Sequence, residues 1–147
     1  MVAACGGATP HASLRYDALL DAVLSASTEV AKQNAKQVEI DREHAIVQTA
    51  WQVVGAAHEP ADPYDFSGIA KIDGAGMTKY FARYEIRVIG PRPWQVVVVA
   101  HASKWRDGDV KPTELPDDNP PTWLIERRDR IVKDIDSRLR TSAISPQ

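Results

Sequence analysis

The feature that most constrains the fold is a pair of strand-like segments joined by a proline-containing turn. In residues 80–89 every second residue is apolar and charged residues lie between them, which predicts a strand buried on one face. Residues 94–105 contain four consecutive valines, which predicts a central strand covered on both sides. The Gly-Pro-Arg-Pro sequence at residues 90–93 lacks two backbone donors, so the two segments are predicted to form a hairpin. A four-residue and a five-residue connection place opposite faces of the second strand against the core, and the sequence leaves that register open.

A second hairpin and two helices complete the predicted elements. Residues 38–40 alternate apolar and polar, and residues 45–54 are rich in β-branched and aromatic side chains, so these two segments are predicted to pair. From Ser13 onward apolar residues recur at spacings of three and four, which predicts an N-terminal helix. The same spacing predicts a C-terminal helix over residues 122–140.

The order of these elements favours an α+β fold. Consecutive hairpins imply an antiparallel sheet, and two amphipathic helices need a surface to cover. We therefore predict a four-stranded antiparallel sheet with the N-terminal and C-terminal helices packed on one face. Residues 1–12 are predicted to be a tether, residues 13–140 a single domain and residues 141–147 a disordered tail. Two long loops are predicted at residues 55–79 and 106–121.

Composition limits the classes of partner. The chain has 147 residues, a size typical of one domain, and its 18 basic and 20 acidic side chains leave a formal net charge of −2. General nucleic-acid-binding domains are usually basic, so we expect no nucleic-acid partner. No stretch of 18 apolar residues is present, so the sequence predicts no membrane-spanning helix.

The single cysteine lies in a sequence that resembles a bacterial lipobox, where a signal peptidase cuts before a lipid-carrying cysteine. Val2, Ala3 and Ala4 precede Cys5 in the required order, and two glycines follow. The charged and apolar regions of a signal peptide are missing, so either the sequence starts too late or the similarity is accidental. The first alternative predicts an outer-membrane lipoprotein that faces the periplasm. The second predicts a free cysteine in a frayed end and a cytoplasmic protein.

No group of residues shows the spacing of a catalytic or metal site. The four histidines are dispersed, with His44 in a predicted turn and His101 in a predicted strand, and no nucleophile motif or phosphate-binding glycine loop is present. We therefore expect no enzymatic activity, no metal and no cofactor. Candidate partner-binding residues are the arginines and tryptophans of the central hairpin: Arg83, Arg87, Arg92, Trp94 and Trp105. The alternatives for these side chains are a solvated face of mixed charge and ordinary aromatic packing.

The order of elements resembles that of BamC-type lipoproteins, which are accessory parts of the outer-membrane β-barrel assembly machine. The resemblance is carried by residues 19–23, residues 38–51 and the last helix, and it would cover about residues 14–140. It implies a helix-grip fold, in which an N-terminal helix leads into antiparallel hairpins and a C-terminal helix closes the sheet. It also implies a non-catalytic role beside another cell-envelope protein.

Two hypotheses of different classes remain. The first is a non-catalytic lipoprotein, anchored in the membrane through Cys5, whose domain is an accessory or scaffolding component that binds another envelope protein. The second is a small apolar-ligand binder or enzyme similar to cystatins and nuclear transport factors, in which a curved sheet and a helix enclose a pocket. His101, Tyr84 and Trp94 would line that pocket, and a cavity larger than about 300 Å³ with converging polar groups would favour this hypothesis.

Overall fold

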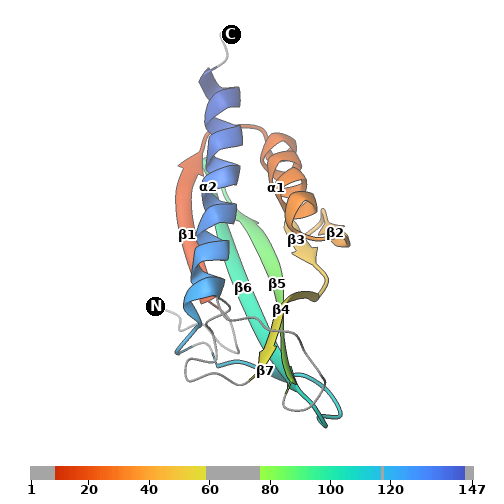
Figure 1. The fold of residues 1–147 in the computed structure, drawn as a ribbon. Helices are drawn as coiled ribbons and strands as arrows, with labels where there is room; N and C mark the ends of the chain where they lie inside the picture. The colour runs from red at the N-terminus through yellow and green to blue at the C-terminus, as the bar shows by residue number, and fades with distance from the viewer. Residues whose placement is uncertain (1–8, 59–76, 117, 145–147) are drawn as a thin grey trace.

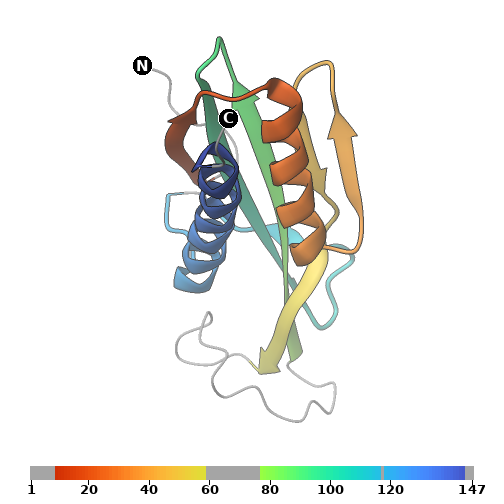
Figure 2. The same ribbon diagram turned by 90° about the horizontal axis from the view of Figure 1, so that it is seen from above.

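The computed structural model describes residues 9–58, 77–116 and 118–144, and in it one sheet carries two helices on the same face (Figures 1 and 2). The elements follow in the order β1 (Thr9–Tyr16), α1 (Leu20–Asn34), β2 (Val38–Asp41), β3 (Ile46–Thr49), β4 (Gln52–His58), β5 (Met77–Ile89), β6 (Trp94–Arg106), β7 (Thr113–Glu114) and α2 (Thr122–Ile144). Helix α1 packs on β3, β2 and β5, α2 packs on β6 and β1, and the two helices contact each other. The α+β class and the antiparallel sheet with two helices are thus confirmed.

Strands β5 and β6 form the long hairpin at the centre of the sheet. Ile86 pairs with Val98, and both are fully buried, so the even-numbered residues of the two strands face the helices. Ile89 pairs with Gln95, so residues 90–94 lie between the last paired positions of the two strands. Of the two predicted registers, the structure therefore has the one with a five-residue connection. The alternation that the sequence shows in β5 therefore corresponds to one covered face and one face without helices.

The sheet has seven strands, not the four that the sequence predicts. Its order is β1-β6-β5-β3-β2, with β4 beside another part of β5 and β7 beside β6, and every pairing is antiparallel. Strand β1 takes the place of residues 9–12 of the predicted tether and of the first predicted helical turn, β4 is a separate strand, and β7 has only two residues. The predicted number is wrong because β1 pairs with β6 far along the chain, β4 is separate from β3 and pairs with β5, and β7 is too short to show a strand pattern.

The N-terminal region shows the largest difference from the sequence prediction. Strand β1 begins at Thr9 and pairs with β6, so residues 9–12 belong to the sheet and not to a tether. Helix α1 begins at Leu20 instead of Ser13, although Val23 is fully buried as the helical spacing predicts. Pairing with a central strand here outweighs the local helical pattern, as tertiary context commonly does.

Other boundaries shift by smaller amounts. The β2–β3 hairpin is confirmed, but the strand predicted over residues 45–54 is divided into β3 and β4. Strands β4 and β5 take the two ends of the first predicted loop, whose residues 59–76 lie outside the described residues. The second predicted loop contains β7, and α2 continues to Ile144, so the first four residues of the predicted tail are helical.

The core lies between the sheet and the helices. It contains fully or almost fully buried side chains from both layers: Val23, Val30, Val47, Ile86, Val98, Ile131 and Ile135. Tyr80 and Trp123 meet edge-to-face with their ring centroids 6.3 Å apart. The Tyr16 hydroxyl donates a hydrogen bond of 2.6 Å to Asp136 Oδ1, which joins β1 to α2. Within the described residues no helix has the length and apolar character needed to cross a membrane.

Candidate functional site

The β5–β6 hairpin has a second face, which points away from the helices. We call it the helix-free face and define it by the odd-numbered residues of β5 and β6 between positions 79 and 105. Figure 2 shows both helices on the opposite side of the sheet. Three of the five predicted partner-binding residues, Arg83, Arg87 and Trp105, lie on this face.

An apolar hollow of about 430 Å³ lies on the helix-free face. Its floor is a row of cross-strand partners on four neighbouring strands, Val53, Phe81, Ser103 and Glu114. Ser103 has the smallest side chain of the row and is one of the residues that line the hollow. The lining is completed by Trp51 and Gln52 on one side and by Lys111 and Pro112 on the other.

Two tryptophans on this side of the sheet are covered by cations. The Cζ atom of Arg83 lies 5.3 Å from the ring centroid of Trp51, and Nζ of Lys79 lies 5.6 Å from that of Trp105. Both distances are within the range at which a cation is attracted to an aromatic ring. The Trp105 indole also donates a hydrogen bond of 2.9 Å to the Asp109 carbonyl oxygen, which fixes the orientation of the ring.

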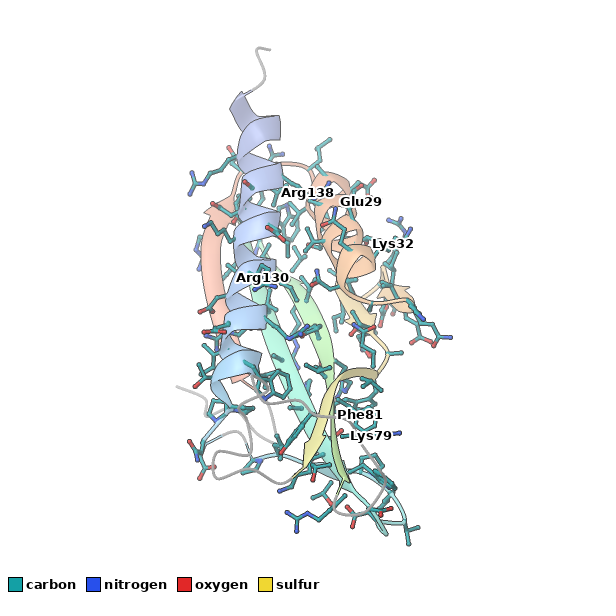
Figure 3. The ribbon with its side chains drawn as sticks, in the orientation of Figure 1. Glu29, Lys32, Lys79, Phe81, Arg130 and Arg138 are labelled. Carbon is teal, nitrogen blue, oxygen red and sulfur yellow. The ribbon has the colours of Figure 1, made fainter. Side chains whose placement is uncertain are left out.

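These side chains make the hollow locally basic. The residues that line it or take part in the two cation–ring pairs include three cations, Lys79, Arg83 and Lys111, and one anion, Glu114. Figure 3 shows Lys79 and Phe81 close together beside β4. The positive excess contrasts with the formal net charge of −2 for the whole chain. The arrangement therefore favours an apolar ligand that carries negative charge.

Beside the hollow, a carboxylate joins two basic side chains. Glu85 Oε2 accepts a hydrogen bond of 2.6 Å from Arg87 Nε, and Glu85 Oε1 lies 3.8 Å from His101 Nε2. The His101 side chain is only 8% exposed and that of Glu85 13%. His101 is therefore buried beside Glu85 on the helix-free face and is not part of the apolar core.

No metal centre appears among the described residues, where no group of three or more histidine, cysteine or carboxylate side chains is placed to hold an ion. His44 lies in an exposed turn, as the sequence predicts, and its Nδ1 lies 2.8 Å from Asp41 Oδ2. The hydrogen bonds from His44 hold the pKa of Asp41 below its usual value.

The other two predicted partner-binding residues lie at the opposite end of the hairpin. Arg92 Nε donates a hydrogen bond of 2.6 Å to Asp17 Oδ1, and the Trp94 indole donates one of 3.1 Å to the Ala18 carbonyl oxygen. A Cβ atom at Gly90 would stand 2.2 Å from the Trp94 ring, so the ring packs directly against the turn. These two residues connect the turn to the segment before α1 and are not part of the candidate site. Cys5 lies outside the described residues.

The three residues predicted to line an enclosed pocket do not converge. Tyr84 is on the helix-covered face of β5, whereas His101 is on the helix-free face of β6. Burial raises the pKa of the Tyr84 hydroxyl, and the nearby Arg127 and Arg130 oppose that rise without cancelling it. Trp94 lies at the far end of the hairpin, so the predicted set of pocket residues is wrong.

Sequence reasoning missed the residues that form the hollow itself. Phe81 is one of the odd-numbered residues of β5, and the alternation already placed it with Arg83 and away from the core. The places of Val53 and Ser103 in the same row depend on the registers of β4 and β6, which no local pattern fixes.

Comparisons with known proteins add no assignment. No family model matches the chain, and no curated protein matches it significantly. One solved structure that resembles it is the crystal structure of a DUF4468 family protein from Bacteroides ovatus, with a TM-score of 0.43 and 10% sequence identity over 95% of this chain and 86% of that chain. A likeness of this size carries no argument about ligand or partner.

Proposed function

We propose that this chain is a non-catalytic, lipid-anchored domain of the cell envelope whose helix-free face binds another envelope protein. The observation that carries the docking part is the hollow beside Ser103, because apolar walls and ring-bound cations meet there on a surface without helices. Tryptophan and arginine are enriched among the residues that contribute most to protein–protein binding. An accessory role is also what the resemblance to BamC-type lipoproteins implies.

The buried charges on the helix-free face support a binding role more than a catalytic one. A general base needs to reach a substrate proton, and a nucleophile needs such a base beside it. Glu85 accepts a hydrogen bond from Arg87, and the side chain of His101 is almost fully buried. The exposed side chains around the hollow are instead mostly apolar or basic, with Trp51 40% and Val53 60% exposed.

Covalent geometry relates the proposed anchor to the domain. Three residues separate Cys5 from Thr9, the first residue of β1, and such a segment spans at most about 14 Å. A lipid on Cys5 would therefore hold the sheet close to the membrane surface. Two or more acyl chains give stable anchoring, since each buried CH₂ contributes about 0.8 kcal/mol.

Photo-crosslinking in the native host tests the docking part. A photoreactive residue at Val53, in the hollow, is expected to give an adduct with one envelope protein, and the same residue at Lys133, an exposed position on α2, is expected to give none. Ser103→Leu should remove the Val53 adduct because the larger side chain fills the hollow. Adducts that form equally from both positions, or that survive Ser103→Leu, would contradict docking at this site.

The intact mass of the protein from its membrane fraction tests the anchor. The gene is expressed with its upstream genomic segment included. A chain that begins at Cys5 and carries diacylglycerol and acyl mass is the expected result. An unmodified chain that retains Met1 in the soluble fraction would contradict the proposed anchoring and leave the docking proposal to the crosslinking result.

The volume of the hollow favours one second candidate function, the binding of a small apolar anion. A hollow of about 430 Å³ falls within the range of small-molecule sites, roughly 300–1,000 Å³. Native mass spectrometry of the protein from its host would show a bound small molecule that Ser103→Leu removes. A protein of unliganded mass with a Val53 crosslink to a protein would exclude this candidate.

A further inference from the structure

The charges along β5 are spaced like the side chains of an extended peptide. Lys79, Phe81 and Arg83 are alternate residues of one strand and lie on the same face. Each cation therefore stands about 7 Å along the strand from Phe81, which is the distance between alternate residues of any extended chain. A peptide lying parallel or antiparallel to β5 presents alternate side chains at the same interval.

Resting on the docking function proposed above, we infer that the hollow binds an extended acidic segment of the partner. One aromatic or large aliphatic side chain of this segment enters the hollow beside Ser103. Carboxylates two residues before it and two residues after it meet Lys79 and Arg83. The recognised pattern is acidic, any residue, apolar anchor, any residue, acidic.

The lining of the hollow suits one apolar anchor. Phe81 and Val53 form the apolar part of its floor, and Trp51 and Pro112 stand at its two sides. Val53 is 60% exposed, so covering it with a partner side chain removes apolar surface from water. The floor, the sides and the small Ser103 define a depression for a side chain rather than a flat apolar patch.

Charge complementarity selects an acidic segment over a basic or neutral one. Lys79 and Arg83 are already held over aromatic rings, so their side chains are partly ordered before binding and less entropy is lost on contact. Lys111 adds a third cation at the edge of the hollow. Glu114, the one anion in the lining, belongs to β7 and lies across the sheet from β5. These charges are accessible to solvent, so the attraction weakens as ionic strength rises.

Two peptide isomers test the inferred pattern. The probe is Asp-Ser-Phe-Ser-Asp with both ends blocked, and the matched control is Ser-Asp-Phe-Asp-Ser, which has the same composition and charge. Only the probe can make both exposed ion pairs, so we expect it to bind about fivefold more tightly than the control. The fluorescence of the tryptophans beside the hollow measures binding. Equal affinity of the two isomers would overturn the proposed spacing.

Variants identify the groups that read the pattern. The double variant Lys79→Gln with Arg83→Gln should bind both isomers equally, whereas Lys133→Gln should retain the fivefold preference. Ser103→Leu should lower the affinity for both isomers by more than tenfold because the leucine side chain occupies the space of the apolar anchor. Thermal unfolding shows that each variant is folded. A preference that persists in the double variant, or is lost in Lys133→Gln, contradicts the assignment of Lys79 and Arg83.

The two proposals fail in different ways. A Val53 crosslink that Ser103→Leu removes, together with isomers that bind equally, would retain docking at the hollow and reject the acidic pattern. A Val53 crosslink that maps to a segment with the acidic spacing supports both. Isomers that bind with the expected preference while no crosslink forms in the host would support the recognition chemistry and reject the envelope partner.

Discussion

The two faces of the β5–β6 hairpin are built from alternate residues of the same strands, yet their characters are opposite. Between positions 80 and 102 the even-numbered residues of these strands carry no charge, and Tyr80, Ile86 and Val98 among them are fully buried beneath the helix layer. The odd-numbered residues include the charged Arg83 and Glu85, and two of them, Phe81 and Ser103, line the hollow. One hairpin thus provides both the core of the domain and its candidate binding surface.

This difference teaches that stability and binding are separable in this protein. Substitutions on the covered face act on apolar burial, which dominates the free energy of folding. Substitutions of the cations and rings around the hollow act on partly exposed side chains, whose individual contributions to stability are small. Because the side-chain period of a strand is two, a shift of a single position exchanges one kind of effect for the other.

A pair of isoleucines on β5 gives the largest expected effect. Ile86 is fully buried and Ile89 is 45% exposed on the other face. Ile86→Ala should lower the free energy of unfolding by about 3 kcal/mol because it leaves a cavity under the helices, and Ile89→Ala by less than about 1 kcal/mol. Urea denaturation of both variants measures the difference. Similar losses at the two positions would remove the distinction between the faces.

A smaller effect is expected where the covered layer reaches solvent, at the hydrogen bond between Tyr16 and Asp136. Tyr16→Phe should lower the free energy of unfolding by about 1 kcal/mol at pH 7. Burial alone would raise the pKa of Asp136, but the hydrogen bonds from Tyr16 and Arg140 outweigh it and hold the pKa below 3.8.

The pH dependence of this variant follows from the lowered pKa. A carboxyl group whose pKa is lowered by folding stabilises the fold at pH values above its pKa in the unfolded chain. This stabilisation is lost as the pH falls through the pKa of the group in the folded protein. The difference in the free energy of unfolding between wild type and Tyr16→Phe should therefore be full at pH 7 and decrease below about pH 3.8. Urea titrations at several pH values measure it. A difference that stays constant into strong acid would exclude Asp136 as the titrating partner.

The smallest effect is expected on the helix-free face. Arg83→Gln removes the cation above the half-exposed Trp51 ring and should lower the free energy of unfolding by about 0.5 kcal/mol. Thermal unfolding measures this loss, and Lys133→Gln at an exposed position of α2 is the control. A loss as large as that of Ile86→Ala would mean that the helix-free face supports the fold as strongly as the core does.

The central hairpin was predictable because its signals are local. Alternation in β5 is a property of ten consecutive residues, and the prolines before β6 mark the turn. Strand β1 was not predictable in this way, because its identity comes from pairing with β6 across most of the chain. Apolar residues recur at helical spacing from Tyr16 onward, but Tyr16 is the last residue of β1 and α1 begins only at Leu20. In the sequence the two elements therefore look like one helix.

The candidate site was predictable in part for the same reason. Arg83 and Trp105 were predicted as binding residues because they are charged or aromatic residues in predicted strands, and the structure places both on the helix-free face. Trp94 was grouped with Trp105 although eleven positions, an odd number, separate them on one strand, so their side chains point to opposite faces. Ser103 was missed because the sequence gives no sign that a small residue lies in a row of larger partners.

The pairing of β1 with β6 also orders events during synthesis. Thr9 is made early, but its partner Ala100 appears only after most of the chain has been translated. Pairings between such distant residues form slowly, and strand edges without partners are prone to wrong pairing in the meantime. The β5–β6 hairpin can form as soon as both strands have emerged, with one edge of β6 still bare. Strand β1 therefore precedes the other described strands along the chain, but it can join the sheet only after β6 has emerged.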